Sequence, residues 1–168
     1  MLDQITVERI KLIHPKERKQ LLIDYTYVNE VLLGKGVRLR FAYTYRSPEE
    51  QDKLFKQRPK VTNAKSWQSV HQYGLAFDIV LLLDKDGDGK FTEASWDTRA
   101  DWDKDGTPDW SEVRDYFKSK GWSYGGDWKG FKDYPHFEKT YNLTTSQMYS
   151  KIANGNYIIE NGIKYINL

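Results

Sequence analysis

The chain carries two histidines in segments that also contain carboxylates, an arrangement that can hold a metal ion. His71 precedes Asp78 by seven residues, with a glycine between them, and Asp133 later precedes His136 by three residues. Two imidazoles and one carboxylate make a three-ligand catalytic zinc site that leaves a fourth position for water. Zinc lowers the pKa of such a water to about 7. His71, Asp78 and His136 therefore predict a hydrolytic zinc centre.

Hydrolysis at such a centre also needs a general base that is not itself a metal ligand. Asp133 is the candidate, because the rigid Tyr134–Pro135 step holds it close to His136. The third histidine, His14, lies in no comparable context, and we expect it to be structural.

Two longer patterns surround these residues. Ser-x-His-x-x-Gly-x-Ala-x-Asp occupies residues 69–78, and Asp-x-x-His occupies residues 133–136. Together they resemble the VanY-like D-Ala-D-Ala carboxypeptidase and L-alanyl-D-glutamate peptidase family, zinc enzymes of bacterial and phage wall lysis. Shorter stretches at residues 12–15, 45–47, 62–64 and 125–128 resemble further family motifs, and Gly-Gly-Asp-Trp at the last of these is typical of the L-alanyl-D-glutamate branch. The resemblance runs from about residue 9 to residue 140, interrupted by an acidic insertion.

The resemblance implies roles for individual residues. It implies zinc ligation by His71, Asp78 and His136, and catalysis by Asp133 as the base. Arg46 would hold a substrate carboxylate or the carbonyl of the scissile bond, because a guanidinium binds oxygen pairs as a fork. A structural ion pair is the alternative for this arginine.

Two further polar residues are expected to contribute to substrate binding. Gln51 and Ser69 would orient either the substrate or Arg46. For Ser69, the alternative is a structural role as the cap of a turn.

The implied function is an endopeptidase that hydrolyses the L-Ala–D-Glu bond in the stem peptides of bacterial peptidoglycan. Asp133 favours this branch, because the carboxypeptidase branch usually has glutamate as its base. A D-Ala-D-Ala carboxypeptidase and a catalytically inactive, zinc-containing wall-binding module remain the alternatives. We expect a phage endolysin, held in the host cytoplasm until it is released to the cell wall, because the N-terminal segment has no apolar core of signal-peptide length.

The acidic insertion contains a stretch with the spacing of a twelve-residue calcium loop. Oxygen-bearing side chains stand at loop positions 1, 3, 5, 7, 9 and 12, with glycine at position 6. These residues are Asp101, Asp103, Asp105, Thr107, Asp109 and Glu112. The sequence therefore predicts Ca²⁺ as a second cofactor, with a solvated acidic loop as the alternative.

A second acidic loop opens in the same way, with Asp84, Asp86 and Asp88. Its twelfth position is Ser95, so the bidentate carboxylate of a calcium loop is missing. This loop is expected to bind calcium weakly or to lend ligands to the first site, with a solvated loop as the alternative.

Hydrophobic periodicity and turn signals predict an α+β fold: a single compact domain with a small antiparallel sheet and packed helices. Expected helices begin at residues 15 and 48 and after a cap at Asp109 or Ser111, and expected strands cover residues 37–44, 76–83, 122–124 and 136–138. Asn161-Gly162 predicts a terminal hairpin. We divide the chain into a zinc peptidase domain at 1–143, with its insertion at about 84–112, and a C-terminal extension of helix and hairpin at 144–168.

Composition limits the other function classes. The 168 residues carry a formal charge of +2 and no cysteine, which excludes disulfides, thiol nucleophiles and cysteine zinc sites. Without a dense run of Lys and Arg, nucleic acid is not an expected partner. No stretch approaches the roughly 20 apolar residues that cross a bilayer. We expect a monomer whose partner is peptidoglycan.

Overall fold

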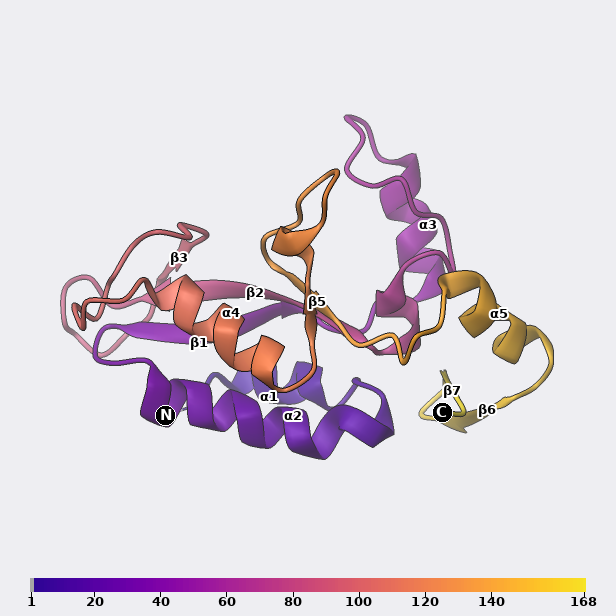
Figure 1. Cartoon of the computed structure of the whole chain (residues 1–168), viewed down its shortest axis with the longest axis horizontal. Coiled ribbons are helices and arrows are strands. Elements are labelled where there is room, and N and C mark those ends of the chain that lie inside the picture. Colours follow the sequence, from indigo (N-terminus) through magenta and orange to yellow (C-terminus); the bar gives the residue numbers. More distant parts are fainter. Residues whose placement is uncertain (1) are drawn as a thin grey trace.

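The computed structural model describes residues 2–168 and contains a five-stranded antiparallel sheet with helices packed around it (Figure 1). The strands follow the order β1-β2-β5-β4, and β3 also pairs with β2. They are β1 (Val37–Tyr43), β2 (Ala76–Leu83), β3 (Glu93–Ser95), β4 (Ser123–Tyr124) and β5 (His136–Glu138). The predicted α+β class with one compact domain is confirmed.

The helices lie along the long strands and at the end of the sheet opposite β3. Figure 1 shows α1 and α2 beneath β1 and β2, with the β3 segment at one end of the sheet and α3 and α5 toward the other. The helices are α1 (Gln4–Ile10), α2 (Pro15–Tyr27), α3 (Pro48–Lys56), α4 (Asp109–Ser119) and α5 (Thr145–Ala153). A π-helical segment, η1 (Val28–Leu32), continues α2, and two short 3₁₀ helices are η2 (Val70–Tyr73) and η3 (Gly125–Asp127).

Strand β2 is the centre of the sheet, with β1 on one side and β3 and β5 on the other. Seven of its eight residues are buried, as the continuous apolar run predicts, and Asp78 is the partly exposed exception. Asp78 and His136 are direct partners in the β2–β5 ladder. Strand pairing therefore brings together two of the three predicted zinc ligands.

A stack of aromatic rings packs against the face of the sheet opposite to the one that carries Asp78 and His136. The Phe77 ring lies 4.3 Å from that of Phe41 and 5.2 Å from that of Phe137, centroid to centroid. Phe137 stands between His136 and Glu138, and successive residues of a strand point to opposite faces. Burial of Phe137 in the core thus directs both polar neighbours to the other face.

The C-terminal extension shares a core with the segment that carries His71. Its helix α5 is followed by the hairpin β6 (Tyr157–Glu160) and β7 (Ile163–Ile166), closed by Asn161 and Gly162 with the positive φ angles of a type I′ turn. Met148, Ile152 and Ile166 of the extension pack with Val70, Tyr73, Leu75 and Ala76. The extension therefore packs against the segment that carries the predicted zinc ligand His71.

Some elements differ from the prediction. Helix α1 and strand β3 were not expected, and the first predicted helix changes from α to π geometry at Val28 before it ends at Leu32. The predicted strand at 122–124 begins one residue later, at Ser123, and the N-cap of α4 (Asp109–Ser119) is Pro108 instead of Asp109 or Ser111. Across residues 2–168, no helix has the length and apolar character needed to cross a membrane.

Candidate metal centre

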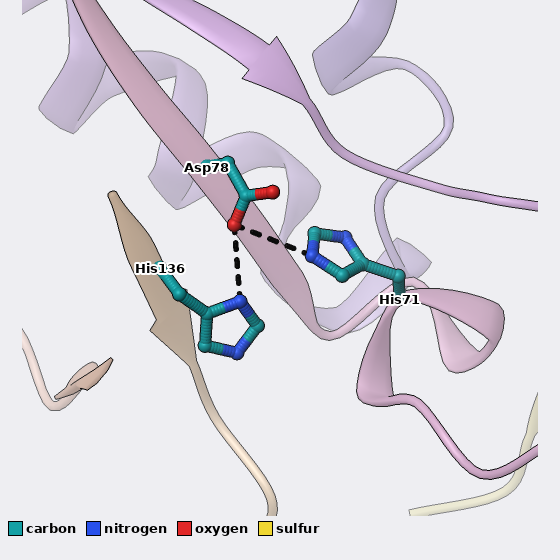
Figure 2. A group of neighbouring side chains, drawn as sticks. All are labelled: His71, Asp78 and His136. Atoms are coloured by element: carbon teal, nitrogen blue, oxygen red, sulfur yellow. Dashed lines mark hydrogen bonds and ion pairs between the residues drawn. The ribbon is translucent and has the colours of Figure 1, made fainter. Parts of the chain in front are cut away.

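Three potential ligand atoms converge above the end of β2 (Figure 2). Oδ1 of Asp78 lies 3.0 Å from Nδ1 of His136 and 3.4 Å from Nε2 of His71. One ligand atom from each residue lies within 4.8 Å of the other two. Figure 2 shows both imidazoles directed toward the same carboxylate, so the structure brings the three predicted zinc ligands together.

His71 is held by the backbone of two neighbouring segments. It lies in η2, which Ser69 caps and which ends at Gly74 with φ +69°. A Cβ at Gly74 would lie 2.9 Å from the backbone nitrogen of His14, so this position needs glycine for both its φ and its space. The ring donates from Nδ1 to the carbonyl of Thr44 at 2.6 Å, so Nε2 is the nitrogen that faces Asp78.

His136 is held by a carboxylate that the sequence analysis missed. Its Nε2 lies 2.8 Å from Oε1 of Glu138, two residues further along β5. A hydrogen bond from the non-ligating nitrogen to a carboxylate orients a metal-binding histidine and raises its basicity. The signal was available, because residues i and i+2 of a strand point to the same face.

The three side chains of this cluster stabilise one another's charged forms. Burial opposes ionisation of Asp78, but the facing imidazoles of His71 and His136 hold the pKa of this carboxyl well below its usual range. Burial alone would lower the pKa of His136, whereas its hydrogen bonds to Asp78 and Glu138 raise the pKa to about 9. Two nitrogens and one carboxylate oxygen, with the second nitrogen of each ring already occupied, are a donor set that fits zinc.

Asp133 is positioned by the backbone of η3. Its N–H donates to the carbonyl of Gly125 at 3.1 Å. A Cβ on Gly125 would lie 2.4 Å from the carbonyl oxygen of Asp133, so only glycine permits this approach. Burial raises the pKa of Asp133, and the nearby Asp78 carboxylate raises it further. A raised pKa suits a group that must accept and then release a proton.

Arg46 stands beside the cluster and is oriented by a buried glutamine. Its Nη1 donates to Oε1 of Gln51 at 3.1 Å, and its guanidinium lies over the ring of Tyr43. Gln51 is 1% exposed and donates to the carbonyl of Ala64 at 2.8 Å. Gln51 therefore positions Arg46, and no carboxylate among residues 2–168 forms an ion pair with this arginine in the structure.

Ser69 performs the structural role that was its alternative. Its hydroxyl accepts from the N–H of His71 at 3.4 Å, and the side chain of Gln72 accepts from the N–H of Ser69 at 3.0 Å. This reciprocal pair is a capping box for the start of η2. Ser69 also lines the same groove as Arg46 and Asp133.

The cluster lies at the base of an open groove with a volume of about 850 Å³. One wall comes from α3 and the chain after it, and the other comes from the segment between η3 and β5, which stand apart in Figure 1. Lining residues include Leu54, Val61, Asn63, Trp128 and Phe131, together with Asp78, Asp133, His71, His136 and Glu138. Phe131 is 85% exposed, so this wall presents an apolar side chain to an incoming ligand.

The predicted calcium residues also converge, at the start of α4. Carboxylate oxygens of Asp101, Asp103 and Asp109 lie within 4.8 Å of one another, as do those of Asp103, Asp105 and Glu112. Burial and the neighbouring aspartates raise the pKa of Asp109 to about 6, and burial and the nearby aspartates raise that of Glu112 to about 7.

The other predicted calcium residues of the insertion are Thr107 and the three aspartates of the second acidic loop. Thr107 is exposed, and its N–H donates to Asp105 at 2.8 Å. Asp84, Asp86 and Asp88 form a separate cluster whose oxygens also lie within 4.8 Å of one another. Asp84 accepts from the N–H groups of Gly87 and Gly89, and Asp86 and Asp88 are exposed. The two loops therefore form separate clusters.

The segment that carries the candidate metal centre is similar to known peptidases. Residues 62–139 match an M15 peptidase family model described as D-alanyl-D-alanine carboxypeptidase. The peptidoglycan L-alanyl-D-glutamate endopeptidase CwlK of Bacillus subtilis (strain 168) is 44% identical over 110 residues, which cover 62% of this chain and 62% of CwlK. The alignment thus spans less than two thirds of that relative.

The fold has a counterpart among solved structures. The crystal structure of the Serratia marcescens L-Ala D-Glu endopeptidase ChiX superposes with a TM-score of 0.52 at 21% sequence identity, covering 82% of this chain and 87% of ChiX. This likeness concerns the fold alone. The residues that match the M15 peptidase family model, 62–139, include His71, Asp78, Asp133 and His136.

Proposed function

We propose that the protein is a zinc-dependent peptidoglycan endopeptidase that hydrolyses the L-Ala–D-Glu bond of stem peptides. The observation that carries this proposal is the convergence of His71, Asp78 and His136 at the base of an open groove that Asp133 also lines. A relative that is 44% identical over the aligned region bears the name of this activity.

In this proposal His71 and His136 bind zinc through Nε2 and Nδ1, and Asp78 binds it through a carboxylate oxygen. These are the three atoms that already face one another. The metal, when bound, polarises the scissile carbonyl and lowers the pKa of the attacking water. Thr44 and Glu138 keep the rings oriented by hydrogen bonds to their other nitrogens.

Asp133 carries the proton in the reaction. As a carboxylate it accepts the proton of the attacking water, and as the acid it donates that proton to the nitrogen of the leaving D-Glu residue. Its half-buried position and its raised pKa favour this exchange over permanent ionisation. The backbone contact with Gly125 keeps the carboxylate at one place on the groove wall.

Arg46 binds a carboxylate or carbonyl oxygen of the substrate. It is partly buried, its guanidinium is held by Gln51 and Tyr43, and it lines the same groove as Asp133. A pre-oriented guanidinium loses little side-chain entropy when it binds an oxygen pair. The groove is partly open to solvent and has a volume of about 850 Å³, which gives a peptide substrate access to these residues.

A second candidate activity has support in the comparison with family models. The matching model is described as D-alanyl-D-alanine carboxypeptidase, and such an enzyme would remove the terminal D-Ala with the same residues. The two activities differ in the bond that is cut. They are distinguished by the new chain ends and the released amino acid.

The test is digestion of purified peptidoglycan followed by mass analysis of the products. New D-Glu amino termini are expected from the wild type with zinc supplied, and none from Asp133→Asn. Asp127→Asn is the matched control, because Asp127 lies in the neighbouring η3, is exposed and pairs with Lys118 instead of lining the groove. Free D-Ala would instead assign the carboxypeptidase activity, and absence of both products would contradict the proposal.

The proposal includes an endolysin route to the substrate. The enzyme would act from the host cytoplasm once a partner has opened the membrane. Lysis is expected when the protein is expressed with a membrane-permeabilising partner and not when it is expressed alone. Lysis on expression alone would contradict this route while leaving the peptidase activity in place.

A further inference from the structure

Five carboxylates of one loop meet at the start of α4, away from the groove. They belong to Asp101, Asp103, Asp105, Asp109 and Glu112. Asp103 belongs to both of the groups whose oxygens lie within 4.8 Å of one another, so the five form one continuous cluster. Carboxylates packed this closely repel one another unless a cation lies among them.

Two of these side chains have oxygens that are buried and unpartnered. Asp109 is 0% exposed, and its Oδ1 has no hydrogen-bond partner among residues 2–168. Oε2 of Glu112 is likewise buried without a partner in the part of the chain that the structure describes. A buried, unpaired carboxylate oxygen destabilises a fold, because burial removes its hydration and no partner replaces it. These two oxygens therefore point to a ligand within the cluster.

The protein supplies no cation of its own to the cluster. Among residues 2–168, none of the ion pairs joins a lysine or arginine to any of these five carboxylates. Backbone N–H groups bind two of the carboxylate oxygens. Gly34 donates to Oδ2 of Asp103 at 2.7 Å, and Trp102 donates to Oδ2 of Asp109 at 2.6 Å. These bonds position the carboxylates without neutralising them.

We propose that the loop from Asp101 to Glu112 binds one Ca²⁺ ion through these five side chains. Calcium takes six to eight oxygen ligands in a flexible geometry, whereas magnesium usually keeps several waters and uses one or two carboxylates. Zinc would prefer nitrogen or sulfur donors, and this cluster has only oxygens. The number and kind of donors therefore select calcium.

The position of the cluster indicates what the ion does. Asp109 and Glu112 are in the first turn of α4, whose Trp110, Val113 and Phe117 are buried in the main core. Binding of calcium would join this turn to the preceding irregular chain at Asp101–Asp105. The bound ion would thus attach the acidic insertion to α4, which is itself packed in the core.

The second acidic loop lacks this support and carries no such proposal. Its Asp86 and Asp88 are exposed, and the buried unpartnered oxygens of residues 2–168 do not include any from Asp84, Asp86 or Asp88. The loop is therefore a suitable internal control for non-specific binding to acidic side chains.

The test is calcium-dependent stability of the zinc-loaded protein, after other metals are removed on a chelating resin and zinc is restored at one equivalent. Calcium at about one hundred times its dissociation constant should raise the Tm by roughly 5–10 °C for a chain of this size. The same concentration of magnesium should produce a much smaller rise. Tb³⁺ luminescence excited through Trp102, which lies within the loop, should titrate with a stoichiometry of one and be reversed by calcium.

Glu112→Gln and Asp109→Asn should abolish most of the calcium-dependent rise, and Asp86→Asn should leave it unchanged. If Asp109→Asn does not fold, Glu112→Gln decides, because Glu112 is only partly buried. No rise in the wild type, an equal rise in Glu112→Gln, or loss of the rise in Asp86→Asn would overturn the proposal. None of these measurements depends on peptidase activity, so the site stands or fails separately from the proposed function.

Discussion

The Nε2 of His136 lies 2.8 Å from Oε1 of Glu138, and the Nδ1 of the same ring lies 3.0 Å from Oδ1 of Asp78. One imidazole thus stands between two carboxylates, of which one belongs to the predicted metal ligands and the other does not. Glu138 can hold the ring in place without occupying a coordination position. It is a positioning residue in the proposed zinc site.

Replacing Glu138 with glutamine should weaken zinc binding. The glutamine amide has no negative charge, so it no longer stabilises the form of the His136 ring that is protonated on Nε2 and has Nδ1 available for the metal. Loss of such a partner typically costs about 10–100-fold in metal affinity. The affinity is measured by competition with a chromogenic chelator. Glu49→Gln, on the exposed face of α3, is the matched control. Equal zinc affinity in wild type and Glu138→Gln would show that the hydrogen bond does not support the metal.

Replacing Gly125 with alanine should lower activity more than stability. The added Cβ would lie 2.4 Å from the carbonyl oxygen of Asp133, so the segment carrying the proposed base must move. A displacement of about 1 Å can cost about 10²-fold in rate. Gly130→Ala is the control in the same segment, because nothing lies within 4 Å of its added Cβ. The peptidoglycan cleavage rate and the Tm are measured together, and similar rates in both variants would contradict this positioning of Asp133.

Several elements of the fold follow from local rules and were predicted. The buried strand β2 follows from its continuous apolar run, and the terminal hairpin follows from Asn161-Gly162. Helix α1 was missed because it is only seven residues long and depends on tertiary contacts. Its N-cap, Asp3, is bound by Arg40 at 2.8 Å, and the hydroxyl of Thr6 accepts from the N–H of Phe41. Such contacts leave no local signal in the sequence.

In the candidate metal centre, too, some features have a signal in the sequence and others depend on tertiary contacts. His71, Asp78, Asp133 and His136 were predicted because their chemistry depends on side-chain type and spacing. The contact between His71 and the carbonyl of Thr44 could not be predicted, because any residue supplies a backbone carbonyl. Ser69 was expected to orient the substrate or Arg46, with a cap as the alternative, and in the structure its hydroxyl caps η2 while the residue also lines the groove. A capping serine and a substrate-binding serine are alike in sequence, and only the geometry of the turn distinguishes them.

The stability of the protein should decrease as the pH falls below about 6.5, in part through His14. Nδ1 of this ring accepts from the N–H of Lys16, and Nε2 donates to the carbonyl of Ile166, so the folded protein requires the neutral ring. Burial lowers the pKa of His14. The unfolded chain then binds more protons than the folded one, and the contribution is complete above the unfolded pKa and lost as the pH falls through the folded value.

The measurement is the free energy of unfolding between pH 7 and pH 5 for the wild type and His14→Asn. Asparagine can still cap α2 but does not titrate. The slope against pH should be smaller in the variant, by up to about 1.4 kcal/mol per pH unit for one proton. Identical slopes would mean that His14 is not held neutral, whatever the other histidines contribute.

Removal of calcium should lower peptidase activity even when zinc is retained, if both proposals hold. The first turn of α4 contains Trp110, whose Nε1 donates to the hydroxyl of Tyr124 at 3.0 Å. The Tyr124 ring packs against Gly126, where an added Cβ would lie 2.2 Å from it, and the adjacent Gly125 holds Asp133. Greater mobility of the first turn of α4 would therefore also increase the mobility of the groove wall that carries Asp133.

The cleavage rate is measured with and without calcium while the zinc content is monitored. We expect a several-fold fall in the wild type and in Asp86→Asn, and a low rate at either calcium level in Glu112→Gln. Tyr124→Phe should reduce the calcium effect, because the buried indole N–H of Trp110 then loses its partner and the connection to η3 is weakened. A calcium effect on Tm with no change in rate would confine the ion to a stabilising role and refute the connection from Trp110 to Asp133.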